Sequence, residues 1–233
     1  MKKLIIFGLG NIADVAYHHF VRDKEYQVVA FTCDEKWLPG TGGLHYGLPV
    51  LPFEDIQRQH SPASVSMFVA IGYHELNAVR AQKCQEAKAK GYNLISYISP
   101  RADYGSWLDV GENCLILDGV GIQPGVRIGN NVSIWNNTLV GHHSTILDHC
   151  WIAAGATIGG LVTLGERCFV GLNATIGGEL AIGADSFLGA ATLVVKSAPE
   201  RSVFIERGTE KFRLESQEFL RMTKMPALGA SKK

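Results

Sequence analysis

Aliphatic side chains recur at every sixth position through the central part of the chain. The series has no gap and consists of Val110, Ile116, Ile122, Ile128, Ile134, Val140, Ile146, Ile152, Ile158, Leu164, Val170, Ile176, Ile182, Leu188 and Val194. Glycine often follows the aliphatic residue, and a small or β-branched residue such as Val132 or Ala156 stands four positions after it. Helices repeat about every 3.6 residues and strands every two, so neither accounts for this spacing. A hexapeptide β-helix does, because each six residues form a short strand and a corner with the aliphatic side chain inward.

Three such strands complete one triangular coil, so the fifteen aliphatic positions predict five coils. Equivalent positions then stack along the axis at about 4.8 Å, the spacing of neighbouring strands. One predicted column consists of Cys114, Val132, Cys150 and Cys168, which are small enough to fill an inner wall. We therefore expect these cysteines to be reduced packing residues rather than disulfide partners or zinc ligands.

The first hundred residues follow a different pattern, in which apolar strands alternate with helical stretches. The predicted strands are 4–7, 28–32, 67–71 and 94–98, and the clearest predicted helix is 75–90. This alternation is typical of βαβ units with a parallel sheet. Because only about 100 residues precede the β-helix, we predict half of a Rossmann-like fold, which can hold one nucleotide.

A glycine-rich turn follows the first predicted strand directly. It reads Gly8-Leu9-Gly10-Asn11-Ile12-Ala13 and opens a helix whose free N–H groups favour phosphate. Asp34 closes the second strand, where an acidic residue would meet a ribose hydroxyl. A tight turn that binds no ligand is the alternative explanation of the glycine motif.

Polar and aromatic side chains stand out among the mostly small residues of the central repeats. They are Trp135, Asn136, Asn137, His142, His143, Asp148, His149 and Trp151. His142 and His143 fall at a corner, and Gly160 lies one full coil after His142. Neutral imidazole can take a proton from an amine or hydroxyl that attacks a thioester, and a bare glycine amide can face the developing oxyanion. For His149 we favour a solvated surface position. Because a flat β-helix flank encloses no cleft, we expect a neighbouring subunit of a trimer to complete the pocket.

The charge balance and the N-terminus limit the partners and the compartment. Lys plus Arg and Asp plus Glu number 22 each, so no basic surplus is present to bind nucleic acid or an anionic membrane. The apolar run that begins at Leu4 ends at Gly8, too short for a signal peptide or a membrane span. We therefore expect a cytoplasmic protein.

Several segments resemble one known family over nearly the whole chain. They are Ile5–Gly10, Phe31–Lys36, Phe68–Gly72 followed by Arg80, Ile98–Pro100 and Val140–Ser144. In these segments the chain is similar to the sugar O-acyltransferases of the sialic acid O-acetyltransferase type, which include bacterial nucleotide-aminosugar N-acetyltransferases. The resemblance implies a homotrimer in which residues 1–100 bind a nucleotide-linked sugar. It also implies that acetyl-CoA lies between adjacent β-helices, formed by residues 101–200.

The resemblance assigns roles to individual residues. His142 falls on the catalytic base, and Gly160 on the position whose amide faces the thioester carbonyl. The residues expected to bind substrate are Gly8, Gly10, Asn11, Asp34, Glu35, Lys36, Gly72, Tyr73, Asn136 and Asn137. Those expected to bind coenzyme A are Trp151, Gly160 and Gly178, with His142 and His143 as the catalytic pair. No metal is expected.

The chain departs from the family pattern at two positions and at its C-terminus. His143 stands where the family usually has an Asp or Glu that orients the base, and Trp151 replaces a histidine that often contacts the acetyl group. A backbone carbonyl, Asn137 or a group of a neighbouring subunit is therefore expected to orient His142. In the C-terminal segment, 201–233, residues 209–223 predict an amphipathic helix. We expect it to pack on the end of the β-helix, with the coenzyme A groove as the alternative.

Other functions remain compatible with the same features. His142, His143 and His149 are available for a zinc-dependent, carbonic-anhydrase-like hydro-lyase, although a six-residue spacing puts His143 and His149 on different edges of the prism. The glycine-rich turn also allows an NAD-binding oxidoreductase or sensor, in which the β-helix is an assembly scaffold. A purely structural β-helix is a further alternative.

Overall fold

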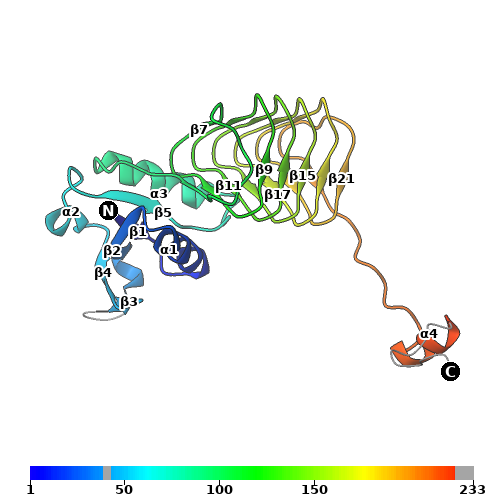
Figure 1. The fold of residues 1–233 in the computed structure, drawn as a ribbon, viewed down its shortest axis with the longest axis horizontal. Coiled ribbons are helices and arrows are strands. Elements are labelled where there is room, and N and C mark those ends of the chain that lie inside the picture. The colour runs from blue at the N-terminus through cyan, green and yellow to red at the C-terminus, as the bar shows by residue number, and fades with distance from the viewer. Residues whose placement is uncertain (39–42, 224–233) are drawn as a thin grey trace, which may run out of the picture.

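The computed structural model describes residues 1–38 and 43–223, and it confirms an α/β unit, a left-handed β-helix and a short C-terminal helix (Figure 1). The elements of the α/β unit are β1 (Lys2–Phe7), α1 (Asn11–Asp23), β2 (Tyr26–Cys33), the 3₁₀ turn η1 (Glu35–Trp37), β3 (Leu44–His45), β4 (Leu48–Pro52), α2 (Ile56–Gln59), β5 (Ser66–Val69) and α3 (Ala78–Ala89). The strand order is β3-β4-β2-β1-β5, and only the β3–β4 pair is antiparallel. None of the helices in the described ranges is long and apolar enough to cross a membrane.

The predicted strand 94–98 is wrong as a single element. Leu94 makes an isolated parallel bridge to Met67, whereas β6 (Tyr97–Ile98) pairs with the first coil of the β-helix. The chain therefore leaves one sheet and enters another within these five residues. Strand β4, which was not predicted, pairs with β2 although it contains Pro49 and Pro52. Proline removes a strand donor, which weakens the local strand signal.

Three parallel sheets form the walls of the β-helix. Sheet 1 contains β6 (Tyr97–Ile98), β8 (Leu115–Ile116), β11 (Ser133–Ile134), β14 (Trp151–Ile152), β17 (Phe169–Val170), β20 (Phe187–Leu188) and β22 (Val203–Phe204). Sheet 2 contains β7 (Asp109–Val110), β10 (Arg127–Ile128), β13 (Thr145–Ile146), β16 (Thr163–Leu164) and β19 (Ala181–Ile182). Sheet 3 contains β9 (Gly121–Ile122), β12 (Leu139–Val140), β15 (Thr157–Ile158), β18 (Thr175–Ile176) and β21 (Leu193–Val194).

The period-six residues build the core of the prism, as predicted. Each strand pairs in register with the strand one coil away, so that Ile134 lies between Ile116 and Ile152. Every aliphatic residue of the series is buried except Val110, which packs against the core in the first coil. The column of Cys114, Cys150 and Cys168 is fully buried and its thiols are free, which confirms their role in packing.

Many corners of the β-helix share one backbone conformation, a left-handed residue. The third residue after each of many inward aliphatic residues has a positive φ, for example 56° at Asn131, 59° at Asn137 and 56° at His143. Asn and His tolerate this left-handed conformation better than most residues, and glycine takes it at Gly119, Gly125 and Gly155. The corner geometry therefore fixes the backbone of His143 independently of any ligand.

Sheet 1 carries the contact with the α/β unit. Leu115 and Leu117 join the core beneath α1 together with Phe20, while Trp151 and Phe169 pack near Leu76. The α/β unit consequently covers the outer side of sheet 1 over the early coils (Figure 1). Sheets 2 and 3, and the corner between them, lie on the other sides of the prism.

A carboxylate of the first coil anchors this contact at its edge. Asp118 accepts two hydrogen bonds from the Arg22 guanidinium, both at 2.9 Å, and a further bond from the Ser99 hydroxyl. The Arg22 guanidinium holds the pKa of the Asp118 carboxyl well below its usual range. Asp118 thus links α1 to the β-helix through its charged form.

The C-terminal helix differs from its prediction in length and position. α4 (Ser216–Met222) begins seven residues later than the predicted start at 209, and none of its residues is buried. An extended segment carries it away from the last coil (Figure 1), so the expected packing on the end of the β-helix is wrong for this protomer. The connecting segment is almost entirely exposed, and the Phe219 ring packs on Phe212.

Replacing Asp118 by asparagine should lower the thermal denaturation midpoint at pH 7. Losing a charge-assisted pair costs about 1–3 kcal/mol, and about 2–4 °C per kcal/mol is typical at this chain length. A carboxyl with a depressed folded pKa stabilises above its unfolded pKa of about 3.9 and loses that contribution as the pH falls further. The difference between wild type and Asp118→Asn should therefore shrink below about pH 4.

Thermal melts of both proteins across pH 3–8 measure this effect. Asp109→Asn is the matched control, because Asp109 is an exposed carboxylate on β7. Equal midpoints for wild type and Asp118→Asn at pH 7 would contradict the anchoring role.

Candidate active site

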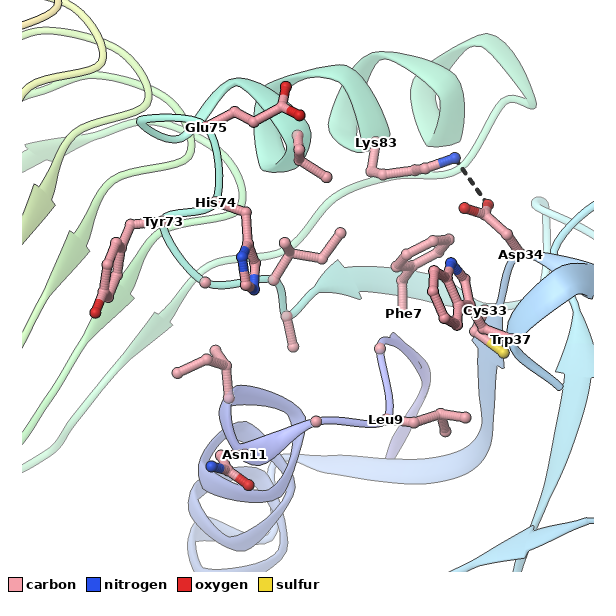
Figure 2. A pocket seen from close by; sticks show the side chains of 17 residues that line it. Phe7, Leu9, Asn11, Cys33, Asp34, Trp37, Tyr73, His74, Glu75 and Lys83 are labelled. Atoms are coloured by element: carbon pink, nitrogen blue, oxygen red, sulfur yellow. Dashed lines mark hydrogen bonds and ion pairs between the residues drawn. The ribbon is translucent and has the colours of Figure 1, made fainter. Parts of the chain in front are cut away.

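A cleft of about 980 Å³ opens at the carboxyl ends of β1, β2 and β5, beside the first turns of α1 and α3 (Figure 2). Its lining residues are Phe7, Gly8, Leu9, Gly10, Asn11, Ile12, Cys33, Asp34, Trp37, Ala70, Ile71, Gly72, Tyr73, His74, Glu75, Val79 and Lys83. Open parallel sheets commonly bind ligands at this edge. Six of the predicted substrate residues lie here, namely Gly8, Gly10, Asn11, Asp34, Gly72 and Tyr73.

The glycine-rich turn forms one wall of the cleft. No side chain fits at the first position of this turn. Gly8 has a φ of 126°, and a Cβ there would lie 2.7 Å from the carbonyl oxygen of Ala70. Helix α1 begins at Asn11, with Gly10 as its N-cap and no side-chain capping bond. The amino end of α1 is therefore open toward the cleft and favours a negatively charged group.

Asp34 and Lys83 form an ion pair on the opposite side of the cleft (Figure 2). Lys83 Nζ donates to Asp34 Oδ1 at 2.7 Å and to a carboxylate oxygen of Glu86 at 2.6 Å. Trp37 lies at the mouth, with 68% of its surface exposed. The cleft thus joins a paired carboxylate, a tethered cation and an exposed aromatic ring.

Two of the predicted substrate residues, Glu35 and Lys36, are not among the residues that line the cleft. The Glu35 amide donates to the Glu54 carboxylate at 3.0 Å, and the Lys36 ammonium lies 5.6 Å from the centre of the Trp37 ring. The 3₁₀ turn directs Trp37 rather than its two predecessors toward the site. Trp37, His74 and Lys83 also line the cleft, although the sequence did not predict them. One usable signal was the four-residue spacing of Val79 and Lys83, which places both on one helix face.

The segment before α3 has an unusual backbone. Glu75, Leu76 and Asn77 have φ values of 48°, 49° and 71°, three consecutive left-handed residues without a glycine. Such residues cost about 1–3 kcal/mol each, so surrounding contacts must hold them. Tyr73 packs on Phe169 with ring centres 4.7 Å apart, and the Asn77 amide donates to carbonyl oxygens of the β-helix.

Arg80 is almost fully buried where α3 meets the β-helix. Its guanidinium donates to the carbonyl oxygen of Gly72 and to Oδ1 of Asn77 and Asn131, but none of the described carboxylates pairs with it. Burial lowers the pKa of Arg80 to about 10, so it stays charged at neutral pH. Oxygen dipoles and the Trp151 ring, 5.4 Å away, surround this charge.

A second polar site lies at the corner between sheets 3 and 2. The His142 amide donates to Gln123 Oε1 at 2.9 Å, and Nδ1 of His142 lies 3.2 Å from Nδ1 of His143. Both imidazoles are exposed, and their planes are inclined by 77°. This distance allows one hydrogen bond between the rings, in which one Nδ1 donates and the other accepts.

Gly160 lies directly beneath the His142 ring, one coil along. A Cβ on Gly160 would be 2.6 Å from His142 Nε2, so only glycine leaves room for this imidazole position. Gly178 follows one coil further, close to the Gly160 carbonyl. The structure thus brings together four predicted site residues, His142, His143, Gly160 and Gly178.

Three other predicted residues lie elsewhere on the prism. Asn136 and Asn137 occupy the corner between sheets 1 and 3, and the Asn137 amide stacks over Gly119. The expected orientation of His142 by Asn137 is therefore wrong in this protomer, where His143 is the partner. Trp151 is buried on sheet 1 beside Trp135, apart from the predicted coenzyme A residues Gly160 and Gly178. Its large ring fills the contact with the α/β unit.

His149 lies at the third corner, between sheets 2 and 1. Its Nδ1 lies 2.9 Å from the Asn131 amide nitrogen, and burial lowers the pKa of His149. The structure therefore separates His149 from the His142–His143 pair, against the zinc alternative within one protomer. Over the described part of the chain, no group of three or more His, Cys, Asp or Glu side chains converges as metal ligands.

The chain resembles known families in its repeats. A model of the bacterial transferase hexapeptide matches residues 109–142, and a model of the hexapeptide repeat of succinyl-transferases matches residues 161–180. No curated protein sequence matches the chain significantly.

Solved structures resemble nearly the whole fold. PerB of Caulobacter crescentus, solved with CoA and GDP-perosamine, has a TM-score of 0.75 and 26% identity over 87% of this chain and 93% of that chain. The acetyltransferase domain of PglB from Neisseria gonorrhoeae, solved with acetyl coenzyme A, has a TM-score of 0.76 and 22% identity over 87% and 95%. WeeI of Acinetobacter baumannii has a TM-score of 0.72 and 21% identity over 87% and 96%. With its hexapeptide coils and its α/β unit, the chain has the fold of these left-handed β-helix acetyltransferases.

Proposed function

We propose that the protein transfers the acetyl group of acetyl-CoA to an amino or hydroxyl group of a nucleotide-linked sugar, with His142 as general base. The observation that carries the proposal is the exposed His142 imidazole, held by His143 and seated over Gly160. Perosamine N-acetyltransferase of Caulobacter crescentus, solved with CoA and GDP-perosamine, supports this choice of donor and acceptor.

The His142–His143 contact gives the base its orientation. In the proposed arrangement Nδ1–H of His142 donates to the lone pair on Nδ1 of His143, which leaves Nε2 of His142 free to accept a proton. His143 thereby replaces the carboxylate expected from the family pattern. It stabilises the imidazolium through a lone pair rather than a full negative charge, which is a weaker interaction.

The reaction follows from these two groups and a bound thioester. The sugar nitrogen or oxygen attacks the carbonyl carbon while Nε2 of His142 takes its proton. The negative charge that develops on the carbonyl oxygen is stabilised by the Gly160 amide, for which the described residues provide no acceptor. As the carbon–sulfur bond breaks, the imidazolium returns the proton to the thiolate. The products are the acetylated sugar and free CoA.

The cleft of the α/β unit is the proposed nucleotide site. The open amino end of α1 suits the diphosphate, and Asp34 offers a carboxylate oxygen to ribose or base. In this division residues 1–100 bind the nucleotide-linked sugar, 101–200 transfer the acetyl group, and 201–233 form a C-terminal segment. A single nucleotide suits the five-stranded sheet better than the dinucleotide of the NAD alternative.

Each complete site requires two copies of the chain. The cleft lies on the sheet 1 side of the prism, whereas His142 lies at the corner opposite sheet 1. Sugar and thioester must meet within about 3–3.5 Å for attack. We therefore propose a homotrimer in which the cleft of one copy faces the His142 corner of its neighbour, with CoA in the groove between them and Gly178 along its path.

A thiol-release assay with acetyl-CoA and a panel of nucleotide-linked 3-amino, 4-amino and hydroxyl sugars tests the function. Wild type should release CoA with at least one acceptor, and His142→Ala should lower kcat by about 10²–10⁴-fold because proton transfer is lost. His143→Ala should lower kcat by about tenfold or more, while His143→Asp should restore it, since aspartate tolerates the left-handed backbone and supplies the usual carboxylate.

Melting and size-exclusion profiles of the histidine variants serve as controls for folding and assembly. Near-normal turnover by a folded His142→Ala protein would remove the proposed base. Binding of NAD in place of every nucleotide-linked sugar would favour the scaffold alternative.

Alanine substitutions at two adjacent glycines, Gly159 and Gly160, distinguish an effect on folding from an effect on catalysis. In Gly160→Ala the three atoms nearest the new methyl all belong to the His142 ring, which can swing into solvent, so the fold should persist while kcat falls by about 10²-fold. In Gly159→Ala the methyl would lie 2.5 Å from the backbone nitrogen of Gly178, so the coil should lose about 1–3 kcal/mol or more. Melting curves and kcat of both variants measure the contrast. Full activity in Gly160→Ala, or equal unfolding of both variants, is the contradictory result.

A further inference from the structure

Tyr73, His74 and Glu75 line one wall of the cleft (Figure 2). The segment that carries them is attached to the β-helix. We propose that Asn77 and Arg80 are positioning residues that set the shape of this wall, and hence the affinity for the nucleotide-linked sugar. The inference rests on the proposed function, because it takes the cleft as the nucleotide-sugar site. Neither residue lines the cleft, so both act through the segment 72–77.

The backbone conformation of segment 72–77 depends on contacts with residues outside the segment. Glu75, Leu76 and Asn77 are left-handed in succession, whereas the corners of the β-helix use single left-handed residues between paired strands. No strand pairing supports 73–77, which lies between β5 and α3. A run of three such residues persists only when other contacts over-determine it.

Asn77 supplies the first of these contacts. Its side chain is completely buried, and Nδ2 donates to the carbonyl oxygens of Arg167 and Cys168 at 3.2 and 3.3 Å. Its Oδ1 accepts a 2.9 Å bond from Arg80. One side chain thus ties the end of the left-handed run to the β-helix corner between β16 and β17.

Arg80 ties both ends of the segment to the same region. Nη1 donates to the Gly72 carbonyl at 3.2 Å and to Asn77, while Nη2 donates to the carbonyl oxygens of Asn131, His149 and Cys150. A buried charge without a carboxylate is a costly way to fill space, since apolar side chains often do so at least as well. What the guanidinium adds is direction, because its planar donors fix several oxygens at once.

The geometry limits the effect of releasing segment 72–77 to the binding of one substrate, the nucleotide-linked sugar. Gly72 and Tyr73 face the cleft, whereas the bonds of Asn77 and Arg80 reach the corner between sheets 2 and 1. The His142 corner shares none of these bonds. Releasing the segment should therefore weaken binding of the nucleotide-linked sugar and leave the acetyl-CoA site and the base in place.

Asn77→Gly isolates the positioning role. Glycine adopts the φ of 71° without strain, so the turn can still form, but the amide bonds are lost. The KM for the sugar found active with wild type, and its Kd by calorimetry, should rise about tenfold, because loosely held sites lose affinity steeply. The KM for acetyl-CoA and kcat at saturating sugar should change by less than about twofold.

Arg80→Lys is the second variant, for use where Asn77→Gly does not fold. Lysine keeps the charge but lacks the planar fork that joins Gly72 to the β-helix carbonyls, so the same rise in Kd is expected. Arg22→Gln is the matched control. It removes another arginine that bridges the α/β unit and the β-helix, at Asp118, yet Arg22 contacts no cleft residue.

Hydrogen exchange of residues 72–78 provides a readout without substrate. Exchange there should accelerate in Asn77→Gly and stay unchanged in Arg22→Gln. Wild-type protein that binds no nucleotide-linked sugar overturns the proposed function and this inference together. If wild type binds and a folded Asn77→Gly protein binds equally well, or loses kcat and both substrates in proportion, only the inference fails.

Discussion

The stacking of each hexapeptide on the one a coil earlier is the constraint on which the rest of the structure depends. Strand pairing and inward aliphatic side chains fix the register, so residues eighteen positions apart lie above one another, as His142 does over Gly160. No room remains for adjustment, because Gly141 and Gly159 meet the next coil through backbone atoms. The backbone of a corner that carries a chemical site is therefore held in place by the coils on either side of it.

The same prism also positions the α/β unit. Sheet 1 presents aromatic residues such as Trp151 and Phe169 to the α/β unit, and the buried Arg80 and the Arg22–Asp118 pair attach to this side. The cleft and the His142 corner are consequently held apart within one protomer. Assembly of copies, rather than motion within a copy, is the simplest way for them to meet.

Much of this arrangement could be predicted from the sequence, since period-six burial is local and repeated. The aliphatic series, the cysteine column and the glycine-rich turn all lie where the pattern places them. Details that depend on contacts between distant segments could not be predicted from the sequence. The direction of Trp37 is set by a 3₁₀ turn, and α4 lies at the end of an extended segment with none of its residues buried. The three left-handed residues before α3 include no glycine, so the sequence carries no signal of this conformation.

The central claim is that each site joins the cleft of one copy to the histidine corner of another. Co-expression of His142→Ala with the cleft variant Asp34→Arg, followed by purification of mixed assemblies through two different tags, tests it most directly. Each variant alone should be inactive, and the purified mixed trimers should recover roughly one third of wild-type activity, because one of the three interfaces in each mixed trimer joins an intact cleft to an intact histidine. Mixed assemblies that stay as inactive as the separate variants would contradict a site shared between copies.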